Sequence, residues 1–309
     1  MQTNLVFYNV ENLFDTFDDP LTNDNAFLPE AKREWHEKRY ALKQQRIAKV
    51  LKEIEDPMPG IVGLAEIENR KVLLDLVNSL NLDEEQIGIL LADSPDERGM
   101  DVGLLYRKDI FQLVTKTSIP IFFPSDPSDK TRDILYVHLK PDDLPGLHIY
   151  INHWPSRVEG QKATEVKRFD AAKSLRSHMD IILNDTPVAN VLVMGDLNCT
   201  PDSPPVYRVL DKKGHSENPL LNLGWDIHLS KSGSTNYRGK WLLFDQMLVT
   251  PSLLNSSSLK ILDFSVVSYS WMLFYNPKYK DYRPNKTYGG TDYHGGFSDH
   301  LPVKVELKF

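Results

Sequence analysis

Six apolar stretches of the sequence contain, or end in, a side chain that could do acid–base chemistry or hold a cation. Such stretches are typical of buried strands, so these polar groups are removed from bulk water. Burying an unpaired charge costs a large free energy, and the groups should therefore meet one another, a metal ion or water. The residues are Asn9 with Glu11, Glu66, Asn152 with His153, Asp196 with Asn198, Asp245, and Asp299 with His300.

Spacing strengthens two of these pairs. Residues i and i+2 of a strand share a face, so Asn9 and Glu11 can point at one spot, and Asp196 and Asn198 can do the same. A single acid at a strand end is more often a turn former or a helix cap, and Glu66 alone could be a cap. Six such coincidences in one chain make that explanation poor as a joint account and favour one shared polar site.

The elements that carry these residues can be predicted from apolar patterning. Strands are predicted over 4–10, 61–67, 100–107, 133–139, 146–154, 190–196, 241–249, 259–267 and 301–309, helices over 34–55, 70–80 and 161–183, and a loop over 15–31. Strands dominate, and long helices fall between some of them at a spacing too irregular for a barrel of eight βα units. The pattern predicts an α+β fold or a layered α/β sandwich.

The composition is that of a folded, soluble protein. Of its 309 residues, 41% are hydrophobic and 26% are charged, as in ordinary globular domains. No linker or repeat divides the chain, so a single domain over 1–309 is expected. A net charge of −7 argues against binding nucleic acid by a basic field over the whole surface, but not against cleaving it at a local site.

Cysteine content and the start of the chain limit the compartment. Cys199 is the only cysteine, which excludes an intramolecular disulfide and a zinc site built on cysteines. No signal peptide and no bilayer-spanning apolar run is present. We expect a cytoplasmic protein without stable membrane association, although a trimmed exported protein would look the same. A monomer is expected, and nothing in the sequence indicates a protein partner.

The polar strand ends also carry a resemblance to a known family. The segments FYNVEN, GLAEIEN, DVGLLYR, NHWPSR, GDLNCTPDS, FDQMLV and FSDHLPV resemble, in order and over essentially the whole chain, the motifs of the endonuclease/exonuclease/phosphatase superfamily. That superfamily includes deoxyribonuclease-I-like nucleases, abasic-site endonucleases, neutral sphingomyelinases and inositol polyphosphate 5-phosphatases. The resemblance implies a four-layer α/β/β/α sandwich of two packed mixed β-sheets flanked by helices. It also implies metal-assisted hydrolysis of a phosphoester at one edge of that sandwich.

The resemblance implies a divalent cation held by oxygen ligands, for which Mg²⁺ or Mn²⁺ is suited. Glu66 matches the family's metal-binding glutamate. Glu11 is the second expected ligand, because it stands where abasic-site endonucleases carry an acid two residues after their motif asparagine. Asp299 would bind a metal or help to position His300. The cation would polarise the phosphoryl oxygens and steady the leaving oxygen.

The remaining motif residues match catalytic positions of the family. Asp196 would orient or deprotonate the attacking water, and Asn198 would hold a phosphate oxygen or that water. His300 is expected beside the scissile phosphate, as a general acid or as a stabilising cation. Asp245 would hydrogen-bond the other ring nitrogen of His300 and favour the protonated form of that histidine. Asn9 matches the motif asparagine that helps to orient the site.

Three further residues are expected to contact phosphate. His153 matches a second phosphate-contacting histidine of deoxyribonuclease-like and sphingomyelinase-like members, a position where abasic-site endonucleases have no histidine. Arg132 and Arg157 are weaker candidates for holding phosphate. These matches lean away from the abasic-site endonucleases.

The motifs only partly decide the substrate. NHWPSR and NVENLFDT most resemble a bacterial nuclease-like subgroup, which makes nucleic acid the expected substrate. Residues 268–300 interleave aromatic with basic side chains, which could stack bases and contact phosphates or only pack a long loop. The alternatives are a sphingomyelinase-like or inositol-polyphosphate-phosphatase-like enzyme, a catalytically silent binding module on the same fold, and a glycosidase with paired carboxylates. Loss of activity on chelation would separate a phosphoesterase from a glycosidase.

Overall fold

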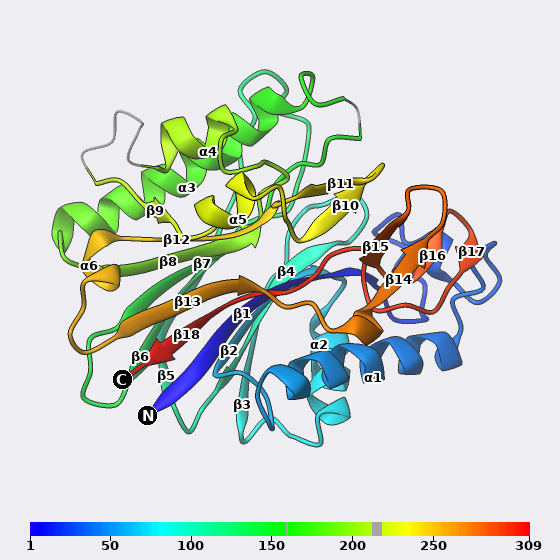
Figure 1. Cartoon of the computed structure of the whole chain (residues 1–309), viewed down its shortest axis with the longest axis horizontal. Helices are drawn as coiled ribbons and strands as arrows, with labels where there is room; N and C mark the ends of the chain where they lie inside the picture. Colours follow the sequence, from blue (N-terminus) through cyan, green and yellow to red (C-terminus); the bar gives the residue numbers. More distant parts are fainter. Residues whose placement is uncertain (159, 212–217) are drawn as a thin grey trace.

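The computed structural model describes residues 1–158, 160–211 and 218–309. Within these residues, two six-stranded sheets pack face to face (Figure 1). The first sheet has the order β13 (Lys260–Val266), β18 (Val303–Lys308), β1 (Gln2–Leu13), β2 (Ile61–Ile67), β4 (Asp101–Arg107) and β3 (Ile87–Ala92). The second has the order β5 (Phe111–Ile119), β6 (Ile134–Pro141), β7 (Leu147–His153), β8 (Asn190–Asp196), β12 (Asp245–Val249) and β9 (Leu221–Asn222).

Both sheets are mixed, and each has a parallel pair near its centre. β1 pairs parallel with β2, and β7 pairs parallel with β8. The carboxyl ends of a parallel pair lie at the same edge of a sheet. The polar residues that end these four strands are therefore brought to one end of the sandwich.

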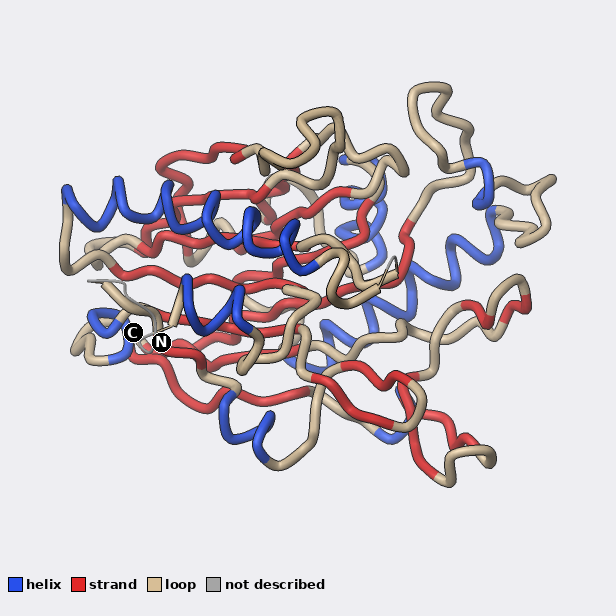
Figure 2. The backbone as a smooth tube through the Cα atoms, turned by 90° about the horizontal axis from the view of Figure 1, so that it is seen from above, coloured by secondary structure: helices blue, strands red, loops and turns tan. Residues whose placement is uncertain are grey.

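The helices form the two outer layers. α1 (Glu37–Ile54) and α2 (Arg70–Ser79) cover the first sheet, whereas α3 (Glu165–Asp185) and α4 (Pro204–Val209) cover the second (Figure 1). Figure 2 looks onto the second helix layer, with the strands running beneath it. The short helices α5 (Trp225–Leu229) and α6 (Pro251–Leu254) and the 3₁₀ turns η1 (Asn25–Phe27) and η2 (Ser270–Met272) lie in connections.

Alternation along each strand divides the apolar residues among three cores. In β1, Leu5 and Phe7 face the second sheet, whereas Val6 and Tyr8 face the helix layer. The third core packs α3 against the outer face of β7 and β8. A strand that is apolar on both faces is expected where both faces are covered, and this accounts for the continuous apolar runs in the sequence.

Three two-stranded hairpins extend from the sandwich. They are β10 (Thr235–Tyr237) with β11 (Lys240–Leu242), β14 (Leu273–Asn276) with β15 (Asp281–Pro284), and β16 (Tyr288–Gly289) with β17 (Asp292–Tyr293). Figure 1 places all three at the same end of the sandwich, beyond the carboxyl ends of β1 and β8. They therefore surround the end to which the polar residues are carried.

The predicted α+β sandwich is confirmed, and so are the three long helices, within a few residues at their ends. The sequence analysis missed β3 and β5, the outer strands on one side of each sheet. β5 has mostly exposed side chains, so it lacks the apolar pattern by which strands are recognised. No helix in the described part of the chain is both long and apolar enough to cross a bilayer.

Candidate active site

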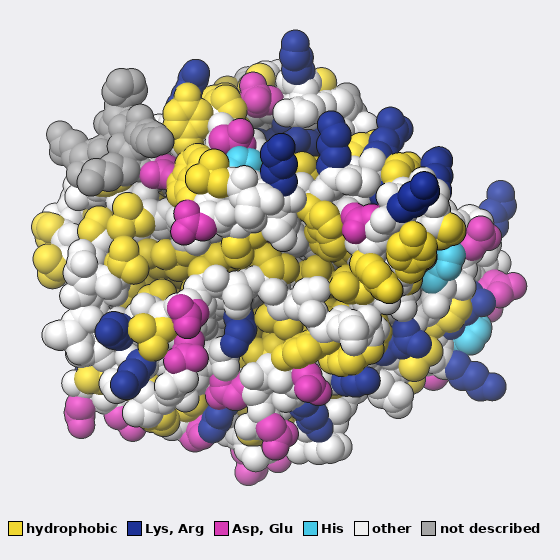
Figure 3. Space-filling model, viewed as in Figure 1, with side chains coloured by type: hydrophobic (Ala, Val, Ile, Leu, Met, Phe, Trp, Pro, Cys, Tyr) yellow, Lys and Arg dark blue, Asp and Glu magenta, His cyan; other side chains and the backbone are white. Residues whose placement is uncertain are grey.

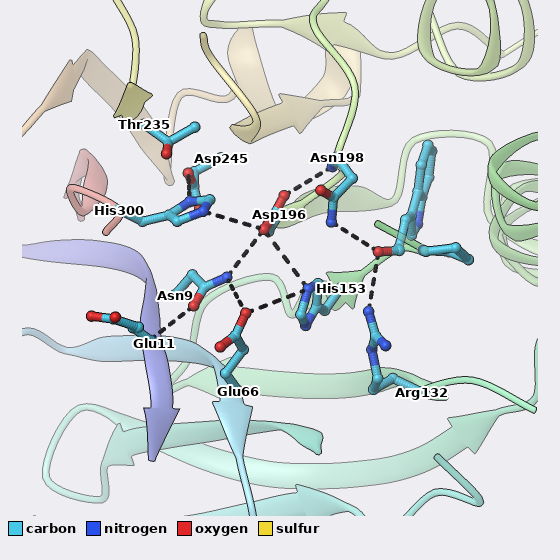
Figure 4. Close-up of polar contacts among 12 residues, drawn as sticks. Asn9, Glu11, Glu66, Arg132, His153, Asp196, Asn198, Thr235, Asp245 and His300 are labelled. Carbon is cyan, nitrogen blue, oxygen red and sulfur yellow. Dashed lines mark hydrogen bonds and ion pairs between the residues drawn. The ribbon is translucent and has the colours of Figure 1, made fainter. Parts of the chain in front are cut away.

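The site forms where β1, β2, β7 and β8 end and where β12 and β18 begin (Figure 4). Sheet register sets its centre. Asp196 at the end of β8 pairs with His153 of β7 on one side and with Asp245 of β12 on the other. His300, just before β18, is joined to the β10 hairpin through a bridge with Thr235. Residues far apart in sequence are thus placed by the pairing of central strands.

Asp196 is the hub of the polar contacts. One carboxylate oxygen, Oδ2, accepts a hydrogen bond from Asn9 Nδ2 at 3.1 Å, and Oδ1 accepts one from the Asn198 backbone N–H at 2.8 Å. Oδ2 also lies 3.8 Å from Nε2 of both His153 and His300. Burial and the nearby Asp245 charge outweigh His300 and raise the pKa of Asp196 to about 6. The carboxylate is therefore a weak base near neutral pH.

His300 is held as a cation. Its Nδ1 lies 2.6 Å from Asp245 Oδ2, and Asp245 is fully buried. Burial alone would lower the pKa of His300, but the charges of Asp245 and Asp196 outweigh it and raise the pKa well above its ordinary value. Ser234 Oγ donates to the same Asp245 oxygen at 2.5 Å. With Nδ1 engaged, the protonated ring presents Nε2–H toward Asp196.

His153, in contrast, is held in the neutral form. Burial lowers its pKa well below the ordinary value, and the positive charges of Arg132 and Arg98 add to the effect. Its Nε2 lies 3.8 Å from Asp196 and 4.0 Å from Glu66 Oε1. Both separations exceed a hydrogen bond, so this nitrogen remains able to bind a substrate atom. The site therefore presents one charged and one neutral imidazole on either side of Asp196.

Glu66 is fixed by its backbone and by two hydrogen bonds. Its Oε1 accepts from Asn9 Nδ2 at 3.2 Å, and its Oε2 accepts from the Asn12 backbone N–H at 2.7 Å. Its φ of +65° lies in the left-handed region, where the register of β2 with β4 is interrupted. Strained backbone of this kind is concentrated at functional sites. Here it turns a carboxylate on a buried strand toward Asp196 (Figure 4).

The donor set suits a hard divalent cation. Burial and the charge of Glu66 raise the pKa of Asp299, although His300 opposes the shift. Burial and crowding also raise the pKa of Asp196, so the carboxylates here destabilise one another's charged forms, a cost that a cation would relieve. Within the described residues, one group of three metal-ligating side chains gathers: Asp196, Asp245 and His300. The 2.6 Å contact between the last two is that of a hydrogen-bonded pair, and the assignment of Glu66 and Asp299 as metal ligands stays a prediction.

Asn198 is brought to the site through a second left-handed residue. Its φ is +47°, and its side-chain Nδ2 donates to the Trp154 carbonyl at 3.0 Å. Arg157 Nε donates to the Asn198 carbonyl at 2.7 Å, and its guanidinium lies over the Phe244 ring. Asn198 therefore joins Asp196 through its backbone, while its amide braces the loop after His153.

Arg132 is largely occupied by protein partners. Its Nη1 donates to Asp96 Oδ2 at 2.9 Å and its Nη2 to the Trp154 carbonyl at 3.2 Å. The side chain is buried. Figure 4 shows it on the far side of His153 from His300. Its expected contact with the scissile phosphate remains a prediction.

Glu11 lies close in sequence to Asn9 but points elsewhere. Its carboxylate oxygens accept from the backbone N–H groups of Thr287 and Tyr288, at 2.6 and 3.3 Å, and one lies 3.9 Å from Lys43 Nζ. Figure 4 shows the carboxylate directed away from Asp196. Burial raises the pKa of Glu11 to about 7. Its expected role as a metal ligand stays a prediction, and in this geometry it clamps the loop that leads to His300.

The sequence analysis did not identify several residues that support the site. Ser234 bonds Asp245, Lys43 faces Glu11, and Ser298 Oγ both donates to the Asn9 carbonyl and accepts from the His300 N–H. Ser298 stands beside Asp299 in a recognised motif, so position was a usable signal. Lys43 lies in the middle of α1, where an ordinary helical lysine faces solvent, and nothing in the sequence marks it.

The chain is similar to a known protein family. A model of the Endonuclease/Exonuclease/phosphatase family matches residues 4–309. No curated protein matches the sequence.

Solved structures give the same fold. An endonuclease/exonuclease/phosphatase family protein from Bacteroides thetaiotaomicron is 17% identical with a TM-score of 0.60, covering 99% of this chain and 97% of its own. Truncated TDP2 of Caenorhabditis elegans is 15% identical (TM-score 0.61; 100% and 98% covered). The mannosyl-6-phosphatase of Bacteroides thetaiotaomicron VPI-5482 is 18% identical (TM-score 0.60; 99% and 100% covered). At these identities the likeness establishes the deoxyribonuclease-I-like sandwich.

Proposed function

The chain belongs to the endonuclease/exonuclease/phosphatase family, and from that premise we propose that it is a metal-dependent phosphodiesterase acting on nucleic acid. One observation carries the proposal. Asp196 lies between a protonated histidine and a neutral one and is tied through Asn9 to Glu66. This arrangement supplies a base, an acid and a carboxylate for a cation within one buried cluster.

A divalent cation fits this cluster. Glu66 and Asp299 would hold it, because burial and the charge of Glu66 raise the pKa of Asp299, and a cation bound to both carboxylates would offset that effect. When bound, Mg²⁺ or Mn²⁺ would supply charge stabilisation to the phosphoryl and leaving oxygens. Asn9 bridges the metal side and the base side, since its single amide donates to both Glu66 and Asp196.

The charge states of Asp196, His300 and His153 give them different roles in the reaction. Asp196, with its pKa near 6, is ionised at neutral pH and accepts the proton of the attacking water. His300 is already protonated, so it cannot act as a base and instead donates Nε2–H to a phosphoryl oxygen. His153 is neutral and donates or accepts one hydrogen bond without adding charge. Asp245 keeps the His300 proton on Nδ1 in place.

The surroundings support nucleic acid as the substrate. The hairpins β10–β11 and β14–β15 lie side by side, joined by a hydrogen bond from Asn236 to Asp281. Tyr237, Tyr275 and Tyr282 are each more than half exposed there. Figure 3 shows Lys and Arg side chains interspersed with apolar and aromatic ones on this part of the surface. Aromatic faces with nearby cations suit stacked bases and their phosphates, and Thr235 of β10 connects this surface to His300.

The test is hydrolysis of bis-p-nitrophenyl phosphate and of plasmid DNA with Mg²⁺ or Mn²⁺. EDTA should abolish both activities. Asp196→Ala and His300→Ala should each lower kcat/KM at least about a hundredfold, the scale of general acid–base groups. Asp142→Ala, which removes an exposed acid that accepts a hydrogen bond from Gln112, is the matched control and should change little.

A substrate panel decides the finer assignment. It should contain supercoiled and single-stranded DNA, RNA, an abasic duplex, sphingomyelin and inositol phosphates. Activity confined to sphingomyelin or inositol phosphates would replace nucleic acid as the substrate. Near-normal rates in both site variants would refute the mechanism, and activity that survives EDTA would refute the metal requirement.

A further inference from the structure

A cavity of about 280 Å³, lined in part by Arg132, opens beside the catalytic cluster. Figure 4 shows Arg132 on the far side of His153 from His300. The cavity is bounded by the loop before β6, the loop before β4, the start of α3 and the residues that follow His153. Four cations line it: Arg98, Lys130, Arg132 and Lys167. The hydroxyl-bearing residues Thr131 and Ser156 also lie on its wall.

The cavity has more positive than negative charge. Asp96 pairs with Arg132 at 2.9 Å and lies 3.7 Å from Arg98, and Asp129 pairs with Lys167 at 2.7 Å. Among the described residues, four cations thus face two carboxylates, which leaves two positive charges in excess. Within the described parts of the chain, Lys130 makes no hydrogen bond or ion pair.

Arg132 also has an unused donor. Its two terminal nitrogens bond Asp96 and the Trp154 carbonyl, but its buried Nε has no hydrogen-bond partner among the described residues. The side chain is only 7% exposed. A buried N–H of a charged group that goes unpaired is costly, and the Arg132 side chain itself lines the cavity.

The cavity and the catalytic cluster share a wall. The Trp154 carbonyl accepts from Arg132 on the cavity side and from Asn198 on the catalytic side. Arg132 and Arg98 both act on His153 strongly enough to lower its pKa. An anion in the cavity would therefore sit next to, and not on, the phosphate that water attacks between Asp196 and His300.

We propose that this cavity binds a second phosphate group of the substrate, adjacent to the phosphoester that is hydrolysed. The inference rests on the proposed phosphodiesterase function and specifies its substrate as one with at least two phosphates. A neighbouring internal phosphate of a strand and a terminal phosphate of a short oligonucleotide share this chemistry. Arg98 and Arg132 share the Asp96 carboxylate, and Lys130 lies on the same wall, so these three side chains supply the excess positive charge.

The experiment compares matched substrates: the dinucleotide TpT, the trinucleotide TpTpT, and TpT bearing a 5′- or a 3′-phosphate. The variants are Arg98→Ala/Lys130→Ala and the control Lys116→Ala/Lys140→Ala, which removes two exposed lysines of β5 and β6. In the first variant, the ratio of kcat/KM for the preferred two-phosphate substrate to kcat/KM for TpT should fall about tenfold. This is the change expected from losing a hydrogen bond between charged groups. In the control the ratio should stay constant.

The choice among two-phosphate substrates identifies the source of the second phosphate. Preference for TpTpT indicates an internal phosphate, and preference for a terminally phosphorylated TpT indicates a monoester. An unchanged ratio in the cavity variant, or an equal fall in the control, would overturn the proposal while leaving the phosphodiesterase function intact.

A binding assay separates the two proposals in the other direction. A fluorescein-labelled thymidine hexanucleotide is titrated in EDTA, where no turnover is expected, and anisotropy is followed against salt. The slope of log K against log salt should become shallower by about 0.7 in the cavity variant, as expected for one lost single-strand phosphate contact. Such a change in a protein that cleaves no phosphodiester would uphold the cavity and refute the proposed function. An unchanged slope would refute the cavity.

Discussion

Asp245→Asn tests whether the Asp245 carboxylate acts by keeping His300 protonated. The substitution keeps the size of the side chain and replaces one buried carboxylate, 2.6 Å from His300 Nδ1, by a neutral amide. A hydrogen bond to a charged group contributes about 1.5–3 kcal/mol. Its loss lowers the ratio of protonated to neutral His300 by about ten- to a hundredfold, at 1.36 kcal/mol per tenfold. Burial, which lowers the pKa of His300, is then opposed chiefly by Asp196.

The direction of the pH dependence follows from these charges. In the wild type the pKa of His300 lies well above its ordinary value, so the acid form persists through neutral pH. In the variant the pKa falls, and the neutral form takes over as pH rises. The activity deficit of Asp245→Asn should therefore be small near pH 6 and grow to about a hundredfold near pH 9, within the range of acid–base groups.

The assay is the pH–rate profile of bis-p-nitrophenyl phosphate hydrolysis at saturating metal, from pH 6 to 9. Ser234→Ala is the matched control, because it removes the other hydrogen bond to the same Asp245 oxygen and leaves the charge. Its profile should keep the wild-type shape. A deficit of equal size at every pH would refute the reasoning, since it would show that Asp245 acts through geometry alone. Thermal unfolding of both variants checks that they fold.

Three further predictions concern other parts of the molecule. Lys43→Met should lower the free energy of unfolding by about 3–5 kcal/mol in urea titrations, because it removes a buried cation that pairs with Glu11 and donates to Thr287 and to the Phe297 carbonyl; Lys43→Met/Glu11→Gln should recover part of it, and no loss would contradict these contacts. Tyr275→Ala/Tyr282→Ala should weaken binding of single-stranded DNA about tenfold, since stacking contributes about 1–3 kcal/mol per base, and unchanged affinity would exclude stacking there. Burial lowers the pKa of His148 to about 4, so the unfolded chain takes up a proton first as pH falls below 6.5. Stability is full above that pH and should drop by about 2 kcal/mol toward pH 4, after allowance for partial exposure, whereas His148→Asn should flatten the curve.

The sequence predicts the convergence of the site better than its details. Strand ends converge because sheet register is a long-range consequence of burying both faces, and the apolar runs that demand this are visible in the sequence. The parallel pairing of β1 with β2 and of β7 with β8 then determines the end of the sandwich at which the polar residues meet. The edge strand β5 escapes prediction for the opposite reason, since it buries almost nothing.

Glu11 shows where strand periodicity stops being informative. The i, i+2 rule puts Asn9 and Glu11 on one face, but Glu11 and Asn12 both have positive φ, at +54° and +51°, and the register of β1 with β2 shifts there. The left-handed backbone there turns the Glu11 side chain away from the face that it would otherwise share with Asn9. No composition signal marks them, because glycine, the usual residue at such φ, is absent from both positions.

The same departure from regular backbone positions the groups that remain in the site. Glu66 and Asn198, like Glu11 and Asn12, are non-glycine residues at positive φ, a conformation that costs about 1–3 kcal/mol each and persists only where surrounding contacts impose it. Those contacts are visible: both Glu66 oxygens are bonded, and Asn198 is bonded through its N–H, its amide and its carbonyl. The strands around them are almost entirely buried and cannot adjust to relieve the strain. The local irregularity therefore depends on the rigid sandwich, and the sandwich turns a carboxylate and an amide inward at the two points where regular strands would not.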